Sequence, residues 1–565
     1  MFNHSSTFTS SQFTPLFGAL RGDTLDWIGD FNAKSLVGNT SDDYVTHNVN
    51  VAMAWKAPAV FWQGSGKDAD RASYETGLGY VLEKNNQPIG MPSGDEILHG
   101  PGSTEGVETC GVVDSIASHA YALRVFGNPA TGDLLETIAF NALAAATNKT
   151  MTGLDYYSLP NEPVAIHGTS KYPEDYDNGM TMSWQSGYPC CRFNWHMGWP
   201  RLTQATWAAT PDGGLAALVY APTIATAKVA GGQTVSFSET TSYPFAEQIQ
   251  LTFHGPTSGF PLMVRVPQWA TSGASVSVDG QAEVGPLTPA SFHTLAHRVW
   301  SDGDVVLLDF PMPITTTAQI NGSVSIHRGP LVYALQIGES WKKTTANTVD
   351  GIDFGEYEAS PTTPWNYALR VDATNAAASF KVVTRPMPDN PFVQATTPVT
   401  LQATGRLVPG WGLRTDAVLA QEVPPSPVQA PGPDAALTLV PFGAETLRIT
   451  ELPVLAAPQT MARDARPPAT GATTLVELYA PWCAACRAVR RAVDGAALRL
   501  GPGVHVERID VDRSPEVALR WNVDALPSFI VVRDGAAIAK HVGVASANAL
   551  VQLVARAGVR YADKD

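Results

Sequence analysis

Cysteine is scarce in this sequence, and so are charged residues. The 565 residues include five cysteines, too few for a disulfide-stapled scaffold. Lys and Arg number 37 against 52 Asp and Glu, which gives a net charge of −15. A general nucleic-acid binder needs a basic face for phosphates, so we expect no nucleic-acid partner.

Long apolar runs and a visible leader are also missing. No apolar run reaches the roughly 20 residues of a membrane span, so we expect no membrane association. The start, MFNHSSTFTS, has no basic region followed by an apolar core, as a secretory signal would. The expected location is therefore the cytoplasm.

Residues 1–208 have apolar residues at helical spacing, which predicts a helical domain. Long polar loops at 85–105 and 148–189 interrupt the helical pattern, and such loops often carry function. The expected helices cover 17–36, 44–63, 68–85, 106–127 and 131–148, with a further helix from 190.

Near residue 209 the spacing of apolar residues changes to every second residue, and this alternation continues to residue 455. Short alternating segments between Gly, Pro and Asp turns predict antiparallel β-sandwich domains over 209–455. Residues 456–470 are rich in Pro and Ala and are expected to form a linker. From Met461 onward, 14 Lys and Arg stand against 11 Asp and Glu. This change in charge predicts a separate module.

The C-terminal module contains a strand, then Cys-Ala-Ala-Cys, then a helix. A C-x-x-C motif in this setting indicates redox chemistry. Cys483 stands at a helix N-terminus, where the helix dipole favours the thiolate. The expected reaction is attack by Cys483 on a protein disulfide, followed by release of the mixed disulfide by Cys486.

The segment 471–565 resembles thioredoxin through WCAAC, through Pro527 in ALPSF and through Glu477. The resemblance implies an α/β thioredoxin-like fold and a thioredoxin reductase as partner. It also implies that Pro527 is cis and helps to bind the substrate chain beside the dithiol. Glu477 stands where a buried Asp is usual and would relay a proton to Cys486. A thioredoxin-like fold without turnover remains an alternative.

A second group of candidate residues consists of three cysteines and a glutamate. Three thiols and a carboxylate can close a tetrahedral zinc site. Adjacent cysteines do not bond to each other without strain, which favours a metal ligand or a nucleophile over a disulfide. Three buried and inert thiols are the alternative on spacing alone. The residues are Glu108, Cys110, Cys190 and Cys191.

Several sequence blocks resemble glycoside hydrolase family 127, which is typified by β-L-arabinofuranosidases. These blocks are GDEIL (94–98), GVETCGVVD (106–114), ETIAFN (136–141), DYYSLP (155–160) and CCRFN (190–194). The resemblance covers about residues 12–455. It implies a multidomain fold in which an (α/α)₆ barrel is followed by β-sandwiches.

The resemblance also implies a site and a reaction. A zinc ion (Zn²⁺) would hold the nucleophilic thiol as a thiolate at neutral pH. The substrate would be a β-L-arabinofuranoside-type glycan, hydrolysed with retention of configuration by two successive displacements. The nucleophile would be the cysteine sulfur, where most retaining enzymes use a second carboxylate. The implied zinc ligands are Glu108, Cys110, Cys190 and Cys191, and Cys190 would also be the nucleophile. The implied acid/base is Glu96 or its neighbour Asp95. The implied substrate contacts are His47, Glu136 and Tyr156.

The helix count departs from the family pattern. A barrel of this type needs twelve helices, and about six are expected before the strands begin. We therefore expect a partial barrel, a chain that starts midway through the family's catalytic domain, and weak glycosidase turnover. Two alternatives stay open. One is an oxidoreductase with an inactive or sugar-binding N-terminal region, and the other is a protein in which neither site is active.

Overall fold

The computed structural model describes residues 47–168, 175–283, 285–295, 298–372, 375–414, 419–456, 473–480, 483–500, 504–511, 514–523, 525–534 and 536–558. The chain divides into two compact units, Met1–Ala456 and Ala457–Asp565. The helix expected at 17–36 lies outside the described residues, as does the linker expected at 456–470 apart from residue 456.

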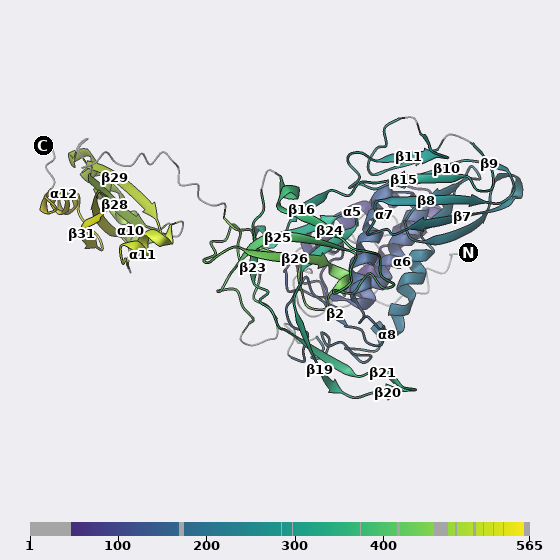
Figure 1. Cartoon of the computed structure of the whole chain (residues 1–565), viewed down its shortest axis with the longest axis horizontal. Coiled ribbons are helices and arrows are strands. Elements are labelled where there is room, and N and C mark those ends of the chain that lie inside the picture. The colour runs from purple at the N-terminus through teal and green to yellow at the C-terminus, as the bar shows by residue number, and fades with distance from the viewer. Residues whose placement is uncertain are drawn as a thin grey trace. The chain divides into compact units, whose positions relative to one another are not determined.

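The described part of the first unit starts with helices (Figure 1). The helix expected over 44–63 is divided in two, because Pro58 occupies the first turn of the second piece and cannot continue the first. The helix expected over 131–148 ends early and continues as a π-helix. The helices are α3 (Asn48–Ala54), α4 (Ala57–Ser65), α5 (Asp68–Asn85), α6 (Thr109–Phe126), α7 (Pro129–Thr137), η1 (Ile138–Leu143), α8 (Cys190–Asn194) and α9 (Gly198–Thr203).

Helix α6 packs closely against α3 through a glycine. A Cβ atom on Gly111 would lie 1.6 Å from Asn48 Oδ1 and 2.7 Å from its Cγ. Asn48 is fully buried, and its Nδ2 donates to the Pro92 carbonyl at 3.2 Å. The absence of a side chain at position 111 therefore lets the first turn of α3 approach α6.

Gly111→Ala should destabilise the first unit by about 2 to 3 kcal/mol, because the methyl group overpacks a buried contact. Gly79 lies in α5 with nothing within 4 Å of its Cβ position. Gly79→Ala is the matched control and should stabilise by roughly 0.5 to 1 kcal/mol, because alanine favours helix more than glycine does. Urea unfolding compares the two, and equal stabilities would contradict this packing.

Three larger sheets follow the helices. Their orders are β13-β10-β5-β4, then β12-β11-β15-β8-β7-β6, then β16-β17-β18-β26-β25-β23 with β24 also on β25. The strands are β4 (Trp207–Ala209), β5 (Leu215–Ala217), β6 (Thr223–Lys228), β7 (Thr234–Thr241), β8 (Gln248–His254), β10 (Leu262–Val266), β11 (Ser275–Val278), β12 (Gln281–Ala282), β13 (Ser291–Thr294), β15 (Val305–Asp309), β16 (Ile314–Ala318), β17 (Val324–Arg328), β18 (Leu331–Leu335), β23 (Tyr367–Leu369), β24 (Lys381–Thr384), β25 (Val399–Leu407) and β26 (Ala435–Pro441).

The expectation of antiparallel pairing needs one correction in these sheets. Strands β5 and β10 pair in parallel. A parallel pair needs a long crossover, which the 44 residues between Ala217 and Leu262 supply. Shorter two-stranded ladders complete the unit: β1 (Val107–Glu108) with β2 (Tyr157–Ser158), β3 (Asn161–Glu162) with β27 (Arg448–Ile449), β9 (Ser258–Phe260) with β14 (Arg298–Trp300), β19 (Glu339–Thr345) with β22 (Glu356–Pro361), and β20 (Thr348–Val349) with β21 (Ile352–Asp353).

A buried carboxyl on β7 gives the first unit a pH-dependent stability. Glu239 is 3% exposed, and its Oε1 accepts from the Ala221 N–H at 2.9 Å. Burial raises the pKa of Glu239 to about 8, from an ordinary value of 4.5. Between these two values the folded protein keeps the proton while the unfolded chain releases it.

Stability should therefore fall as the pH rises through this window, by up to about 1.4 kcal/mol per pH unit for one proton. Glu239→Gln should make this slope shallower by up to one proton, because other buried carboxyls such as Asp155 also have a raised pKa, and urea midpoints measured across the window test it. Glu83→Gln, on the exposed side of α5, is the control and should keep the wild-type slope. An unchanged slope in Glu239→Gln would show that Glu239 is not the source.

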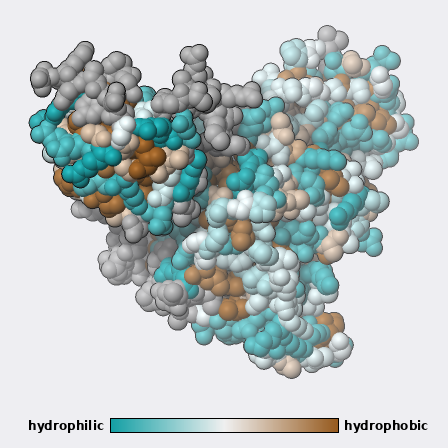
Figure 2. Space-filling model, turned by 60° about the vertical axis from the view of Figure 1, so that its left-hand side comes forward, coloured by the Kyte–Doolittle hydropathy of each residue, from teal (hydrophilic) through white to brown (hydrophobic). Residues whose placement is uncertain are grey.

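The surface drawn in Figure 2 mixes hydrophobic and hydrophilic residues in small groups. Such mixing is ordinary for a globular protein, whose surface always retains apolar atoms. Among the residues that the structure describes, no helix combines the length and the apolarity needed to cross a bilayer.

The second unit is a four-stranded sheet of order β29-β28-β30-β31, with helices on both faces. Leu475, Phe529 and Val531 pack on the side of α10 and α12, and their neighbours Val476 and Ile530 face the opposite side, with α11. The elements are β28 (Thr473–Tyr479), α10 (Ala484–Leu500), β29 (Val504–Asp510), α11 (Pro515–Arg520), β30 (Ser528–Arg533), β31 (Ala536–Val542) and α12 (Ala547–Arg556).

Candidate functional site

Four predicted ligands come together in the first unit. The candidate ligand atoms of Glu108, Cys110, Cys190 and Cys191 all lie within 4.8 Å of one another. We call these four residues the Glu-Cys₃ cluster. Glu108 Oε1 is 3.6 Å from the Sγ atoms of both Cys190 and Cys191. The backbone N–H of Cys110 donates to the Cys191 sulfur at 3.3 Å.

Two chain segments position the cluster. Glu108 ends β1 and directly precedes α6, and Cys110 lies in the first turn of that helix. The register of β1 with β2 sets Glu108 opposite Tyr157. Cys190 and Cys191 begin α8, whose contacts with α6 close the group.

The pKa values of the four side chains in the cluster are shifted in different directions. Hydrogen bonds with Cys110 and Cys191 lower the pKa of the Cys190 thiol. The hydrogen bond with Cys190 raises the pKa of Cys110, and burial raises that of Cys191. Burial also raises the pKa of Glu108, as do the charges of Glu96 and Cys190. Negative charge is therefore favoured on Cys190.

The donor set suits a metal ion. Glu108 Oε2 is buried and has no hydrogen-bond partner, although most buried polar atoms do. Three thiols and one carboxylate are ligands that zinc accepts in a tetrahedral site. The Glu-Cys₃ cluster could therefore bind a metal ion, and its chemistry favours zinc.

Glu96 lies beside the cluster and is held by two donors. His47 Nε2 is 2.9 Å from Glu96 Oε2, and the Tyr157 hydroxyl donates to Oε1 at 2.9 Å. His47 Nδ1 accepts from the Val49 N–H, so the neutral imidazole carries its proton on Nε2 and donates it to Glu96. His47, Glu96 and Glu108 also have ligand atoms within 4.8 Å of one another.

Asp95, the alternative acid/base, has a different environment. Its Oδ1 is 3.4 Å from His99 Nε2, and it lines a small cavity with Tyr157, Asp175 and others. Burial raises the pKa of Asp95, with Asp175 adding to the effect. The structure brings Glu96, rather than Asp95, against His47 and Glu108.

Tyr156 reaches the cluster through its hydroxyl, which lies 3.7 Å from Cys190 Sγ. Its ring packs edge-on against Tyr157 and Tyr176, with centroids 4.7 and 5.4 Å apart. Gly187 makes room for this ring, because a Cβ there would lie 2.3 Å from Tyr156 Cγ. Sequence reasoning did not single out Tyr157, whose hydroxyl donates to Glu96.

Glu136 is not brought to the cluster. It is fully buried and forms an ion pair with Arg265 of β10. It also accepts from the Tyr243 hydroxyl and, at 2.9 Å, from the Tyr220 N–H. Arg265 pairs with Asp133 as well, so this network ties α7 to the first sheet. These contacts give Glu136 a structural role in joining two layers.

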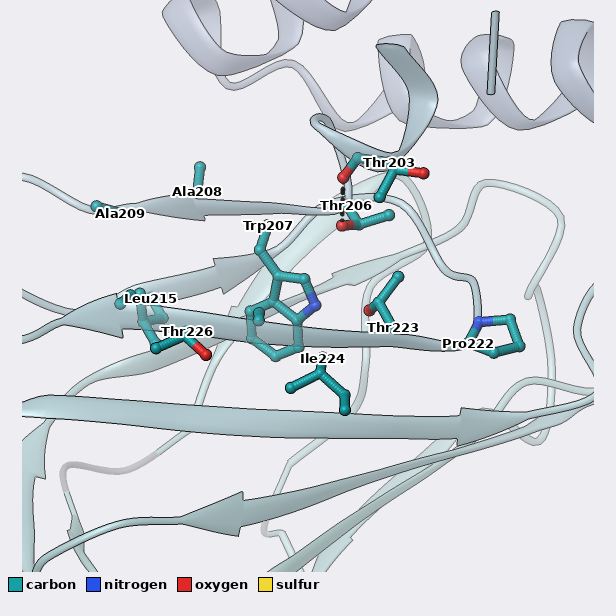
Figure 3. A pocket seen from close by; sticks show the side chains of 12 residues that line it. Thr203, Thr206, Trp207, Ala208, Ala209, Leu215, Pro222, Thr223, Ile224 and Thr226 are labelled. Atoms are coloured by element: carbon teal, nitrogen blue, oxygen red, sulfur yellow. Dashed lines mark hydrogen bonds between the residues drawn. The ribbon is translucent and has the colours of Figure 1, made fainter. Parts of the chain in front are cut away.

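A separate cavity of about 380 Å³ lies between β4 and β6 (Figure 3). Trp207, Thr223 and Ile224 line it, and none of its lining residues is ionisable. It shares no residue with the Glu-Cys₃ cluster. With no carboxylate, histidine or cysteine among its lining residues, this cavity carries no catalytic assignment.

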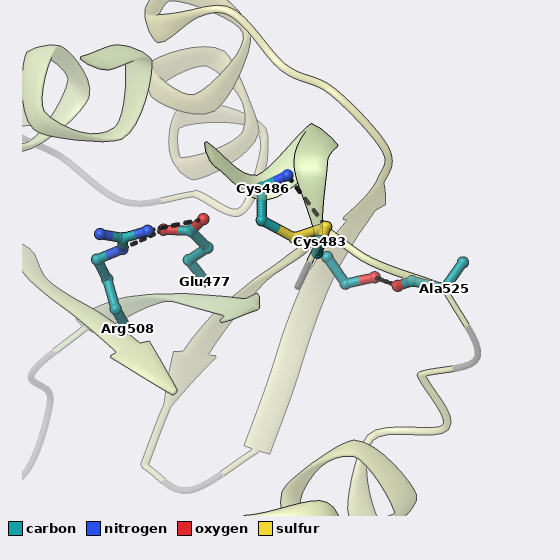
Figure 4. The surroundings of a disulfide bond; sticks show 6 residues. Glu477, Cys483, Cys486, Arg508 and Ala525 are labelled. Carbon is teal, nitrogen blue, oxygen red and sulfur yellow. Dashed lines mark hydrogen bonds and ion pairs between the residues drawn. A yellow bond between two sulfur atoms is a disulfide. The ribbon is translucent and has the colours of Figure 1, made fainter. Parts of the chain in front are cut away.

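In the second unit, Cys483 and Cys486 form a disulfide at the start of α10 (Figure 4). The backbone N–H of Cys486 donates to the Cys483 sulfur at 3.0 Å. Cys483 is 6% exposed and Cys486 is 1% exposed. An N–H directed at the first sulfur stabilises its thiolate after reduction.

Comparison with known proteins identifies this unit. The thioredoxin family model matches residues 469–556. A thioredoxin of Chlamydia muridarum is 30% identical over 82 residues, which are 14% of this chain and 79% of that protein. The C-terminal unit belongs to the thioredoxin family. Its peptide bond Leu526–Pro527 is cis, which confirms that expectation.

The first unit also matches a known family. Residues 214–312 match the model of the beta-L-arabinofuranosidase GH127 middle domain. A solved glycoside hydrolase superposes with a TM-score of 0.54 at 16% identity, over 73% of this chain and 66% of that one. A GH127 beta-L-arabinofuranosidase from Geobacillus stearothermophilus T6 gives 0.51 at 19% identity, over 72% of this chain and 59% of that one.

These comparisons confirm both resemblances. The chain combines a segment that matches the GH127 middle-domain model, in a unit with a GH127-like fold, with a thioredoxin domain. The chain spans about two thirds or less of the length of the two hydrolase structures.

The thioredoxin domain holds Glu477 in an ion pair. The Glu477 side chain is 1% exposed, and Arg508 Nε lies 2.5 Å from its Oε2 (Figure 4). This hydrogen bond raises the pKa of Arg508. Sequence reasoning missed Arg508, although its position on the neighbouring strand β29, directly opposite Glu477, follows from the register.

Proposed function

We propose that the first unit is a retaining glycoside hydrolase acting on β-L-arabinofuranoside-type glycans, joined to a thiol-disulfide oxidoreductase. Helices α3 to α9 would form part of an (α/α)₆-type barrel. One observation carries the hydrolase proposal. Glu108 is shared between two groups, with the sulfur of Cys190 on one side and the His47–Glu96 pair on the other. A nucleophile and an acid/base therefore adjoin one buried carboxylate.

The first step would form a bond between Cys190 and the sugar. The Cys190 sulfur attacks the anomeric carbon while the glycosidic C–O bond breaks. Glu96 gives its proton to the departing oxygen. The Tyr157 and His47 donors hold the Glu96 carboxyl in one orientation and stabilise the carboxylate that remains.

The second step would reverse the roles. The Glu96 carboxylate takes a proton from water, whose oxygen attacks the anomeric carbon, and the C–S bond breaks. Cys190 leaves as a thiolate, and the sugar keeps its original configuration after two displacements. His47 and the Tyr156 hydroxyl are the proposed substrate contacts, because each lies beside a reacting group. Glu136, predicted as a contact from the resemblance, lacks such support.

Glu108, Cys110, Cys190 and Cys191 would hold a zinc ion. Bound zinc supplies positive charge that keeps its sulfur ligands ionised at neutral pH. Glu108 Oε2 is buried without a hydrogen-bond partner and lies 3.9 Å from His47 Nε2, and this atom together with the grouping of three sulfurs supports the assignment.

The purified chain should contain a single zinc ion, measured by elemental analysis. Cys191→Ser should lower the zinc content by at least about tenfold, because serine is a poor ligand for this ion. Cys486→Ser removes a sulfur outside the cluster and is the matched control, so its zinc content should equal that of wild type. Metal-free wild-type protein, purified without chelator, would contradict the zinc assignment.

The thioredoxin domain would reduce protein disulfides. Cys483 attacks the target, Cys486 resolves the mixed disulfide, and a thioredoxin reductase would restore the dithiol. Glu477 would relay a proton to Cys486, and Pro527 would contact the substrate chain.

A function limited to the oxidoreductase is the second candidate. The observation in its favour is coverage: the match spans 79% of a thioredoxin, against 59% of the Geobacillus hydrolase.

A further inference from the structure

The three sulfurs of the Glu-Cys₃ cluster differ in their access to solvent. Cys110 is 3% exposed and Cys191 is fully buried, whereas Cys190 is only half-buried. Its neighbours Tyr188 and Phe193 are 57% and 66% exposed. An oxidant or a protein thiol that approaches the cluster therefore meets the Cys190 sulfur first.

Cys190 also has a partner for disulfide formation. The sulfur atoms of Cys110 and Cys190 lie within 4.8 Å of each other. A disulfide needs the sulfurs at about 2.05 Å, so its closure requires the two side chains to move toward each other. Cys191 is 4.0 Å from Cys190 between sulfurs, but a bond between adjacent residues is strained. Cys110 is thus the favoured partner.

We propose that a disulfide between Cys110 and Cys190 is a substrate of this protein's own thioredoxin dithiol. The dithiol would return the cluster to its thiol form after oxidation by a peroxide. This inference rests on the proposed redox activity of Cys483 and Cys486 and names a substrate for it.

The oxidation balances with hydrogen peroxide as the oxidant. Peroxide converts the Cys190 thiol to a sulfenic acid and is itself reduced to water. The Cys110 thiol then attacks the Cys190 sulfur, a second water leaves, and the disulfide closes. Two thiols and one peroxide yield one disulfide and two waters.

The repair returns two electrons. The Cys483 thiolate attacks the sulfur of Cys190, the accessible one, and Cys110 leaves and takes a proton. The Cys486 thiolate then attacks Cys483 and releases Cys190. The product is the Cys483–Cys486 disulfide, the state that the structure holds. An external dithiol reductant restores the pair.

Reduction of this disulfide would matter for the proposed hydrolase because of the residues that the disulfide contains. Oxidation consumes the proposed nucleophile together with one more of the four proposed zinc ligands, so a single event disables the site. Because both sites are on one chain, the protein always contains one dithiol for each cluster, at any expression level.

The test uses two full-length variants mixed after removal of metal by a chelator. The acceptor, Cys483→Ser/Cys486→Ser, keeps the whole cluster and is oxidised with hydrogen peroxide. The donor, Cys110→Ser/Cys190→Ser, keeps the dithiol and is reduced and then desalted. Differential alkylation with peptide mass spectrometry follows Cys110 and Cys190 of the acceptor. The matched control is a donor that also carries Cys483→Ser.

Peroxide should give an acceptor in which Cys110 and Cys190 are joined. The donor should restore both thiols at least about tenfold faster than the control donor. In the wild-type cluster background, Cys486→Ser should trap a mixed disulfide between Cys483 and Cys190.

Two results would overturn the proposal. One is that peroxide treatment forms no disulfide between Cys110 and Cys190. The other is that the thiols of the acceptor recover at the same rate with the donor and with the control donor. Reduction of insulin by the donor separates this failure from that of the oxidoreductase. If insulin is reduced but the cluster is not, only the present inference falls. If neither is reduced, both fall.

Discussion

Cys190→Ser should lower the hydrolysis of a nitrophenyl β-L-arabinofuranoside by at least about 10³-fold, because a serine hydroxyl stays protonated and attacks poorly. The sulfur is the group that forms the covalent bond in the proposed reaction, and its neighbours Cys110, Cys191 and Glu108 all favour negative charge on it. Release of nitrophenol measures the effect.

Cys483→Ser is the control for that experiment, since it removes a sulfur of the thioredoxin domain and should leave hydrolysis unchanged. Glu96→Gln should slow hydrolysis by about 10² to 10⁴-fold, the usual contribution of a general acid/base. Full activity in Cys190→Ser would exclude the sulfur as nucleophile, even if Glu96→Gln is inactive.

Cys483→Ser should in turn abolish insulin reduction, with a fall of at least about 10³-fold, because no thiolate remains to attack the target disulfide. Cys483 is the more exposed sulfur of the pair and accepts the Cys486 N–H. Turbidity of precipitating insulin chains with dithiothreitol as reductant gives the rate.

The reciprocal control is Cys190→Ser, which should reduce insulin at the wild-type rate. Cys486→Ser should also lose turnover, but should accumulate a mixed disulfide with the target. Wild-type protein that leaves insulin oxidised would contradict the oxidoreductase role, and the domain would then be a thioredoxin fold without turnover.

Local signals in the sequence predicted much of the secondary structure. Helix α5 has the bounds expected for 68–85, with Asp68 and Asp70 in its first turn and Lys84 in its last. The pattern failed at Pro58, where one apolar stripe runs through two helices. The parallel pairing of β5 with β10 was also missed. Alternating apolar and polar residues indicate that a segment is a strand, but they do not show which other strand it pairs with.

The candidate site could be predicted only in part, because its contacts join distant segments. Cys190 lies 82 residues from Glu108, and His47 lies 49 residues from Glu96. No spacing rule links such positions, so the family resemblance supplied them. The resemblance did not reveal the partner of Glu136, because Arg265 is on a strand of the following sheet.

The central claim is that a sugar becomes bonded to the sulfur of Cys190. Glu96→Gln allows the most direct measurement, because a nitrophenyl group leaves without an acid while water still needs a base for the second step. Intact and peptide mass spectrometry of this variant, quenched after mixing with the nitrophenyl glycoside, should find one pentosyl unit on the peptide that contains Cys190. A pentosyl unit on another residue, or nitrophenol release with no adduct on Cys190 at any time, would contradict the account.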